Sequence, residues 1–112
     1  MKTKTLEDVF AYIKLIALNK KWEVNKNPDF LEKIAKGLLK NFERYGFYLC
    51  PCRDSWGDRE KDKDIICPCR YSQPDIDDFG YCYCALFLSK EYQKSGRSPE
   101  SIQDRRPEEL YP

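Results

Sequence analysis

Residues 50–84 read CPCRDSWGDREKDKDIICPCRYSQPDIDDFGYCYC and hold all six cysteines of the 112-residue chain. The cysteines fall as three Cys-x-Cys pairs: Cys50-Pro51-Cys52, Cys67-Pro68-Cys69 and Cys82-Tyr83-Cys84. Four thiolates complete one iron–sulfur cluster, and two further cysteines can form a redox pair. The pattern therefore indicates an iron–sulfur centre connected to a dithiol, which is typical of a reductase.

Other uses of six cysteines agree less well with this spacing. Zinc sites usually combine Cys-x2-Cys knuckles or histidines, and the chain has neither. Three structural disulfides need an oxidising compartment, and cysteines two residues apart are poorly placed to bridge each other. Soft thiolates select iron–sulfur centres, zinc or copper(I). We favour iron–sulfur and keep a zinc-binding interaction module as an alternative.

Length and charge narrow the class of protein. The chain is about one domain long, and 20 Lys and Arg against 19 Asp and Glu leave a net charge of +1. This balance argues against a nucleic-acid binder. No apolar run approaches the roughly 20 residues that cross a membrane, and no signal-peptide core is present. We therefore expect a soluble protein of the cytoplasm with no membrane partner.

Two amphipathic helices are predicted before the first cysteine. The first spans about residues 5–20, with Thr5 as N-cap and Asp8 placed for a capping box. The second begins at Asn27 as N-cap, has a proline at its first position and ends at Gly46 as C-cap. It delivers the chain directly to Cys50, so the first cysteine pair is attached to a rigid element.

The segments between and after the cysteine pairs carry weaker signals. We expect a short exposed helix over 58–63, and a loop over 71–81 that wraps the centre. Residues 85–88 are apolar and predict a short strand or a buried helical turn. Residues 95–99 have the composition of a turn, and 103–112 that of a charged tail.

Arginines follow both Cys-Pro-Cys motifs. A guanidinium from Arg53 beside Cys52 would favour its thiolate. The simpler interpretation, which we prefer, is that Arg53 and Arg70 are surface arginines paired with acidic residues.

The cysteine motifs and their surroundings resemble the catalytic chain of ferredoxin:thioredoxin reductase. In that family two Cys-Pro-Cys motifs and one Cys-His-Cys motif occur in this order. The matching segments are Gly37 to Gly46, Leu49-Cys50-Pro51-Cys52-Arg53, Cys67-Pro68-Cys69, and Cys82-x-Cys84 followed by Ala85-Leu86-Phe87-Leu88. They cover about half of the chain. Residues 102–108 also resemble the ends of archaeal-type members that work without a second subunit.

The resemblance implies roles for all six cysteines. The ligands of a [4Fe-4S] cluster would be Cys50, Cys67, Cys69 and Cys82. Cys52 and Cys84 would form the redox disulfide, with Cys52 as the exposed thiol that forms the mixed disulfide with the protein substrate and Cys84 held against the cluster. The implied electron donor is ferredoxin or a similar low-potential one-electron carrier. The implied substrate is a thioredoxin-like or glutaredoxin-like protein.

One residue departs from the family pattern. Tyr83 stands where the family has a histidine, and the chain has no histidine elsewhere. A phenol with a pKa of about 10 is a poor proton shuttle at neutral pH. The role of that histidine must pass to a hydrogen bond from Tyr83, to another acid or to solvent.

These observations predict a mainly α fold, with a small α+β fold as the variant. We expect one compact domain over 1–112, built from short helices and loops around a [4Fe-4S] cluster. Its parts would be a helical region over 1–46, the cluster and redox-disulfide region over 47–90, and a tail over 91–112. In another class of function, the chain would be an electron carrier or cluster-bearing subunit in which Cys52 and Cys84 are only structural.

Overall fold

Two capped helices form the N-terminal part of the protein in a computed structural model that describes residues 3–112. Helix α1 (Leu6–Lys20) begins with the predicted capping box, in which Thr5 and Asp8 each bond the other's backbone N–H. Helix α2 (Pro28–Tyr45) begins at Asn27, whose side chain accepts two backbone N–H groups. It ends at Gly46 with φ 87°, a left-handed conformation that glycine adopts without strain. Both predicted helices are confirmed.

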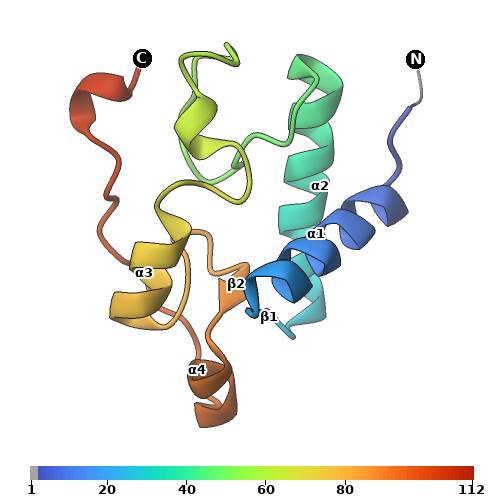
Figure 1. Cartoon of the computed structure of the whole chain (residues 1–112). Coiled ribbons are helices and arrows are strands. Elements are labelled where there is room, and N and C mark those ends of the chain that lie inside the picture. Colours follow the sequence, from blue (N-terminus) through green and yellow to red (C-terminus); the bar gives the residue numbers. More distant parts are fainter. Residues whose placement is uncertain (1–2) are drawn as a thin grey trace.

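The hydrophobic core lies between these helices and reaches the end of the cysteine region. Its buried members from α1 and α2 are Val9, Ile13, Ile16, Ala17, Ile34, Ala35 and Leu38. Leu86 and Phe87, which follow the last cysteine, are buried in the same cluster. Figure 1 shows α1 and α2 on one side of the molecule and the later segments on the other. The core therefore fastens the third cysteine pair to the helices.

A two-stranded antiparallel sheet makes the second connection. Strand β1 (Glu23–Val24) pairs with β2 (Phe87–Leu88), so that Val24 lies opposite Phe87. The short strand expected within 85–88 is thus confirmed. Helix α4 (Lys90–Ser95) follows, capped by the side chain of Ser89. The described residues are about half helical, and their radius of gyration of 13.6 Å agrees with one compact domain.

The loop predicted over 71–81 is wrong, because helix α3 (Ser72–Phe79) occupies most of it. Pro74 lies in the first turn, where the lack of an N–H is tolerated, and Gly80 ends the helix with φ 93°. Buried Ile76 anchors one face. The carboxylate of Asp75, also buried, pairs with Arg105 from the C-terminal segment. Contacts distant in sequence therefore stabilise a helix too short to be stable alone.

The helix predicted over 58–63 is also wrong. The chain forms turns there, and a 3-10 helix, η1 (Lys63–Ile65), follows. The buried carboxylate of Asp62 accepts backbone N–H groups from Trp56, Gly57 and Asp58. This side-chain bonding closes a loop in competition with helical hydrogen bonds.

The C-terminal segment packs against the cysteine region instead of extending as a free charged tail. It contains a second 3-10 helix, η2 (Glu108–Leu110). Arg106 is only 4% exposed and pairs with Asp64, and the indole N–H of Trp56 donates to Leu110 O at 2.8 Å. Charged residues that are distant in sequence therefore become partners in the fold.

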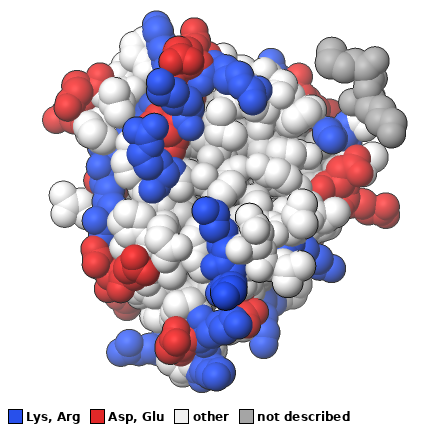
Figure 2. Space-filling model, in the orientation of Figure 1, with Lys and Arg blue, Asp and Glu red and all other residues white. Residues whose placement is uncertain are grey.

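The surface carries mixed charge. On the face shown in Figure 2, basic and acidic side chains lie interspersed around a largely uncharged area, in agreement with the net charge of +1. Within residues 3–112, no helix combines the length and hydropathy needed to cross a membrane.

Candidate metal and thiol site

Helix α2 positions the first cysteine pair through a close packing contact. Pro51 lies so near Gly37 that a Cβ added at Gly37 would come within 2.7 Å of the Pro51 Cβ. The side chain of Asn41 on the same helix donates to Leu49 O at 2.8 Å. The loop that carries Cys50 is therefore held at both its entry and its proline.

Backbone hydrogen bonds join the first pair to the second. Cys50 N–H donates to Ile65 O at 2.9 Å, and Cys67 N–H donates to Tyr48 O at 2.7 Å. The phenol of Tyr12, from α1, donates to Cys67 O at 2.6 Å. The two Cys-Pro-Cys turns thus lie side by side, with one helix fastened to each.

A tight turn at β2 positions the third pair. Cys82 N–H donates to Phe87 O at 3.0 Å, and Ala85 N–H donates back to Cys82 O at 2.7 Å. Ala85 has φ 59°, in the left-handed region. Phe87 N–H also donates to the Cys82 sulfur at 3.5 Å. The turn places the Cys84 Sγ 2.9 Å from the Cys50 Sγ.

Five of the six cysteines line one small cavity beside α2. They are Cys50, Cys67, Cys69, Cys82 and Cys84, with Ile34, Leu38, Leu86 and Phe87 among the apolar lining. All four predicted ligands are in this set. Cys52 is the exposed thiol of the six. It opens instead onto a surface pocket with Pro51, Arg53, Asp54, Tyr83, Asp104 and Tyr111.

The two thiols predicted to form the redox pair lie close together, and a third thiol joins them. The sulfur atoms of Cys50, Cys52 and Cys84 all lie within 4.8 Å of one another. Distance therefore does not separate Cys50 from Cys52 as the partner of Cys84. The two differ in exposure, since Cys50 is buried and Cys52 is exposed. The division of the six cysteines into four ligands and one redox pair stays a prediction.

Arg53 is buried, in contrast to the surface position we expected. Its Nε donates to Asp104 at 3.0 Å, so the expected acidic partner is present. Its Nη1 lies 3.5 Å from the Cys69 sulfur and 3.9 Å from that of Cys50. Burial alone would lower the pKa of Arg53, but the negative charge of Cys69, Cys50 and Asp104 raises it. The arginine is therefore a permanent cation inside the site.

Proton sharing distinguishes Cys50 from the other thiols. Hydrogen bonding from Cys52 and from Cys84, with a smaller contribution from the charge of Arg53, holds the pKa of Cys50 well below its ordinary value. The same contact with Cys50 raises the pKa of Cys52 to about 12. Burial raises the pKa of Cys82 to about 12, and that of Cys67 well above the ordinary value. Cys67 and Cys82 would ionise when a bound cation supplies positive charge.

The residues around the cavity fit a soft, anionic metal centre. The donors that face it from the described chain are mainly thiols, which favour iron–sulfur, zinc or copper(I). Nη2 of Arg53 is buried and has no hydrogen-bond partner within residues 3–112. A cationic donor of this kind is matched by thiolate-ligated iron and sulfide, which carry negative charge. An iron–sulfur cluster therefore suits the site.

Sequence reasoning missed the part of the site that comes from the C-terminus. Asp104 and Tyr111 line the pocket of Cys52, and their side chains are hydrogen-bonded to each other. The feature of the sequence that pointed to this part of the site was the run of charges Asp104-Arg105-Arg106. In the structure, each of these charges pairs with a different segment of the chain.

The fold and site define a class of small, about half-helical proteins in which an exposed thiol lies close to a thiol-lined cavity. A family model described as the ferredoxin thioredoxin reductase catalytic beta chain matches residues 1–109, and the chain belongs to this family. The resemblance inferred from the cysteine motifs is therefore confirmed.

A curated relative extends the comparison. The protein named ferredoxin-thioredoxin reductase, catalytic chain, from Guillardia theta is 33% identical over 67 residues. The alignment covers 58% of this chain and 62% of the relative, so the chain matches less than two thirds of that protein's length.

Proposed function

We propose that this chain is an iron–sulfur disulfide reductase of the cytoplasm. It takes single electrons from ferredoxin or a similar donor and reduces the disulfide of a thioredoxin-like or glutaredoxin-like protein. The observation that carries the proposal is the division of the thiols: five line an internal cavity, while Cys52 is exposed within 4.8 Å of Cys84. Such an arrangement can transfer reducing equivalents from a buried centre to a protein at the surface.

The proposed centre is a [4Fe-4S] cluster held by Cys50, Cys67, Cys69 and Cys82. When bound, it supplies the two electrons of disulfide reduction one at a time. Phe87 N–H donates to the Cys82 sulfur and Arg53 to the Cys69 sulfur, and these donors would stabilise the two thiolates as ligands. The apolar lining excludes water, which tunes the potential of such centres.

Cys52 and Cys84 carry the exchange with the substrate. Cys52 must lose its proton to attack, and the contact with Cys50 that raises its pKa would be lost when Cys50 is a ligand of the centre. The Cys52 sulfur then attacks the substrate disulfide, forms a mixed disulfide and releases the first substrate thiol, which takes up a proton. Cys84 then attacks the Cys52 sulfur, which releases the second substrate thiol and leaves a Cys52–Cys84 disulfide. Two electrons and two protons restore the dithiol. The pocket of Cys52, open to solvent at the surface, is where the substrate disulfide would approach.

Electron transfer from a ferredoxin to a thioredoxin disulfide has a favourable free-energy change. A plant-type ferredoxin at about −400 mV and a thioredoxin at about −270 mV differ by roughly 130 mV. For two electrons this corresponds to about 6 kcal/mol, at roughly 1.4 kcal/mol per 30 mV. Transfer from such a donor to such a disulfide is therefore strongly downhill.

The test combines metal analysis with two cysteine variants. Anaerobically purified protein should contain four irons and four sulfides per chain, as one cubane cluster requires. Cys52→Ser should keep the iron and its visible absorption but lose reduction of a thioredoxin disulfide by reduced ferredoxin. Cys67→Ser, the matched control, should lose iron. Zinc in place of iron, or full reductase activity in Cys52→Ser, would overturn the proposal. Iron together with inactive wild-type protein would favour an electron carrier.

A further inference from the structure

The guanidinium of Arg53 is enclosed on several sides. The ring of Tyr83 lies 4.3 Å from its central carbon, and the ring of Tyr71 lies 5.4 Å away. The side chain is 1% exposed. Both contacts are within the range in which a cation is attracted to an aromatic face. Tyr83, which stands where the family has a histidine, therefore packs against a cation in this chain.

The same guanidinium contacts two of the proposed ligands. Nη1 donates toward Cys69 at 3.5 Å and Cys50 at 3.9 Å. The neighbouring Nη2 is buried without a partner among the described residues, and Arg53 lines the cavity. One side of the guanidinium is thus directed at sulfur, and the other side is held by a carboxylate.

That carboxylate comes from the far end of the chain. Asp104 accepts Nε of Arg53 at 3.0 Å, and it also accepts Arg106 N–H at 3.0 Å. The phenol of Tyr111 donates to its other oxygen. Asp104 is therefore held by the C-terminal segment itself as well as by Arg53.

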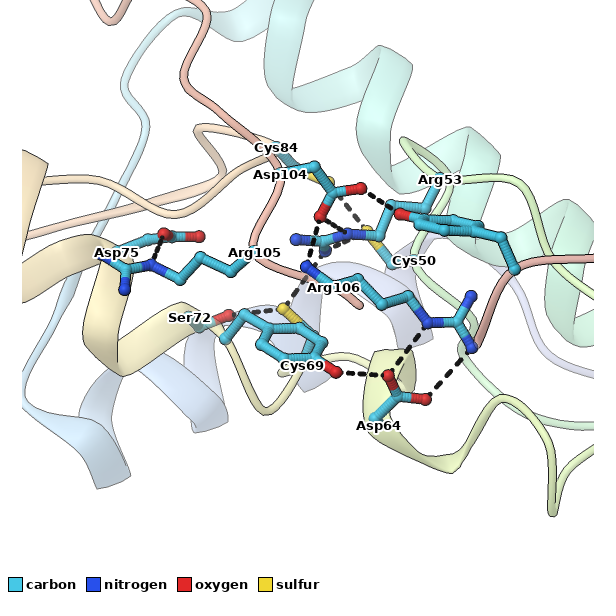
Figure 3. A network of polar contacts seen from close by, with 12 residues as sticks. Cys50, Arg53, Asp64, Cys69, Ser72, Asp75, Cys84, Asp104, Arg105 and Arg106 are labelled. Carbon is cyan, nitrogen blue, oxygen red and sulfur yellow. Dashed lines mark hydrogen bonds and ion pairs between the residues drawn. The ribbon is translucent and has the colours of Figure 1, made fainter. Parts of the chain in front are cut away.

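The C-terminal segment is in turn fastened on both sides of Asp104. Arg105 pairs with Asp75 and Asp78 on α3. Arg106 forms two hydrogen bonds to Asp64, in the segment that precedes the second Cys-Pro-Cys motif. Figure 3 shows the Arg105–Asp75 and Arg106–Asp64 pairs, with Asp104 bonded both to Arg53 and to the backbone of the C-terminal segment. The position of Arg53 is thus set by three segments that are distant in sequence.

We propose that Arg53 is a positioning residue that raises the reduction potential of the cysteine-bound centre, and that the C-terminal segment holds it in place through Asp104. The inference rests on the proposed function, because it assumes an iron–sulfur centre in the cavity. Hydrogen bonds to the sulfur atoms and the net charge nearby are principal determinants of such potentials. A fixed cation stabilises the reduced form, which carries one more negative charge.

The experiment measures the midpoint potential of the centre by anaerobic redox titration, followed by visible absorption. Arg53→Gln should lower the equilibrium constant for one-electron reduction at least tenfold, equivalent to 59 mV toward more negative potential. Arg53→Lys keeps the charge but loses the planar fork, so it should recover part of this shift. Arg70→Gln is the matched control, because Arg70 follows the second Cys-Pro-Cys motif and is exposed. It should leave the potential unchanged.

The midpoint potential of Asp104→Asn shows whether Asp104 acts by positioning Arg53 or only through its own negative charge. Loss of a nearby negative charge, acting alone, would make the potential more positive. Release of Arg53 from the sulfur atoms makes it more negative, which is the result the proposal requires. If Arg53→Gln fails to bind iron, Arg53→Lys and Asp104→Asn still decide the matter.

The outcomes separate this inference from the proposed function. Wild-type protein without iron would overturn both. Iron in every variant, with equal potentials in wild type and Arg53→Gln, would overturn the role of Arg53 alone and leave the reductase intact. A positive or absent shift in Asp104→Asn would overturn the role of the C-terminal segment.

Discussion

Arg106→Met should unfold the C-terminal segment and destabilise the protein strongly. The side chain of Arg106 is 0% exposed, and its neighbours Asp62 and Asp64 are 0% and 4% exposed. Two hydrogen bonds, of 2.9 and 3.2 Å, join the guanidinium to Asp64, and a third of 3.2 Å reaches Lys61 O. Methionine fills a similar length but leaves two buried carboxylates without their counter-charge.

The expected loss in the free energy of unfolding follows from leaving these buried carboxylates unpaired. Breaking a buried ion pair by removing one partner costs about 3–5 kcal/mol. Native domains are stable by about 5–15 kcal/mol, so the loss is a large part of the total. For a domain of this size each kcal/mol lowers the thermal midpoint by about 4–8 °C. The expected decrease is therefore at least about 12 °C.

Circular dichroism melting of wild type and variant, at one protein concentration and pH 7, measures this difference. Arg97→Met is the control, since Arg97 is exposed and no ion pair joins it to another described residue. It should change the midpoint by no more than a few degrees. A decrease in Arg106→Met as small as that of the control would refute the reasoning. The carboxylates of Asp64 and Asp62 would then have to be satisfied by water.

Three further predictions concern the supports of the site. Gly37→Ala, which would add about 1 kcal/mol of stability to an isolated helix, should instead destabilise by up to about 2 kcal/mol, because its Cβ would meet Pro51 at 2.7 Å. Tyr12→Phe should cost about 1 kcal/mol, because it removes the 2.6 Å hydrogen bond to Cys67 O. Stability should also fall in acid. Burial raises the pKa of Asp64, but hydrogen bonds from its neighbours lower it below its ordinary value. Its contribution is therefore complete above pH of about 4 and is lost as pH falls through the folded pKa.

Matched variants check each of these outcomes by thermal melting. Lys33→Ala, at an exposed position of α2, should be nearly neutral, and a midpoint gain in Gly37→Ala would contradict the packing argument. Tyr45→Phe, on a half-exposed ring, controls for Tyr12→Phe, and equal effects would contradict the hydrogen-bond argument. Asp64→Asn should reduce the acid dependence. If the thermal midpoint of Asp64→Asn depends on pH as that of the wild type does, other carboxylates cause the loss of stability in acid.

The helices before the cysteines were predictable because their signals are local. The side chains of Thr5 and Asn27 accept the first N–H groups of α1 and α2, and the proline after Asn27 has no N–H to satisfy. Gly46 ends α2 for an equally local reason, since it alone adopts positive φ without strain at that position. The composition of 58–63 favoured a helix, but the Asp62 carboxylate drew three backbone N–H groups into a loop.

Arg53 shows the limit of reasoning from neighbours in sequence. An acidic partner was expected and is present as Asp104. The arginine was expected at the surface, with a second hypothesis placing it beside Cys52, yet it is buried and contacts Cys69 and Cys50. Its partner is 51 residues away in the sequence, and no periodic pattern connects two residues at that separation.

The order of the three Cys-x-Cys motifs by itself determined the family and the kind of chemistry, because thiolates at fixed spacing restrict the bound group to a soft metal centre. Local caps determined α1 and α2. Only the tertiary structure decided that Arg53 is buried beside the thiols, that 72–79 forms a helix, and that the C-terminal segment closes over the site. Burial and long-range ion pairing decide these features. They depend on which distant segments share a low-dielectric interior, and that is a property of the packed chain.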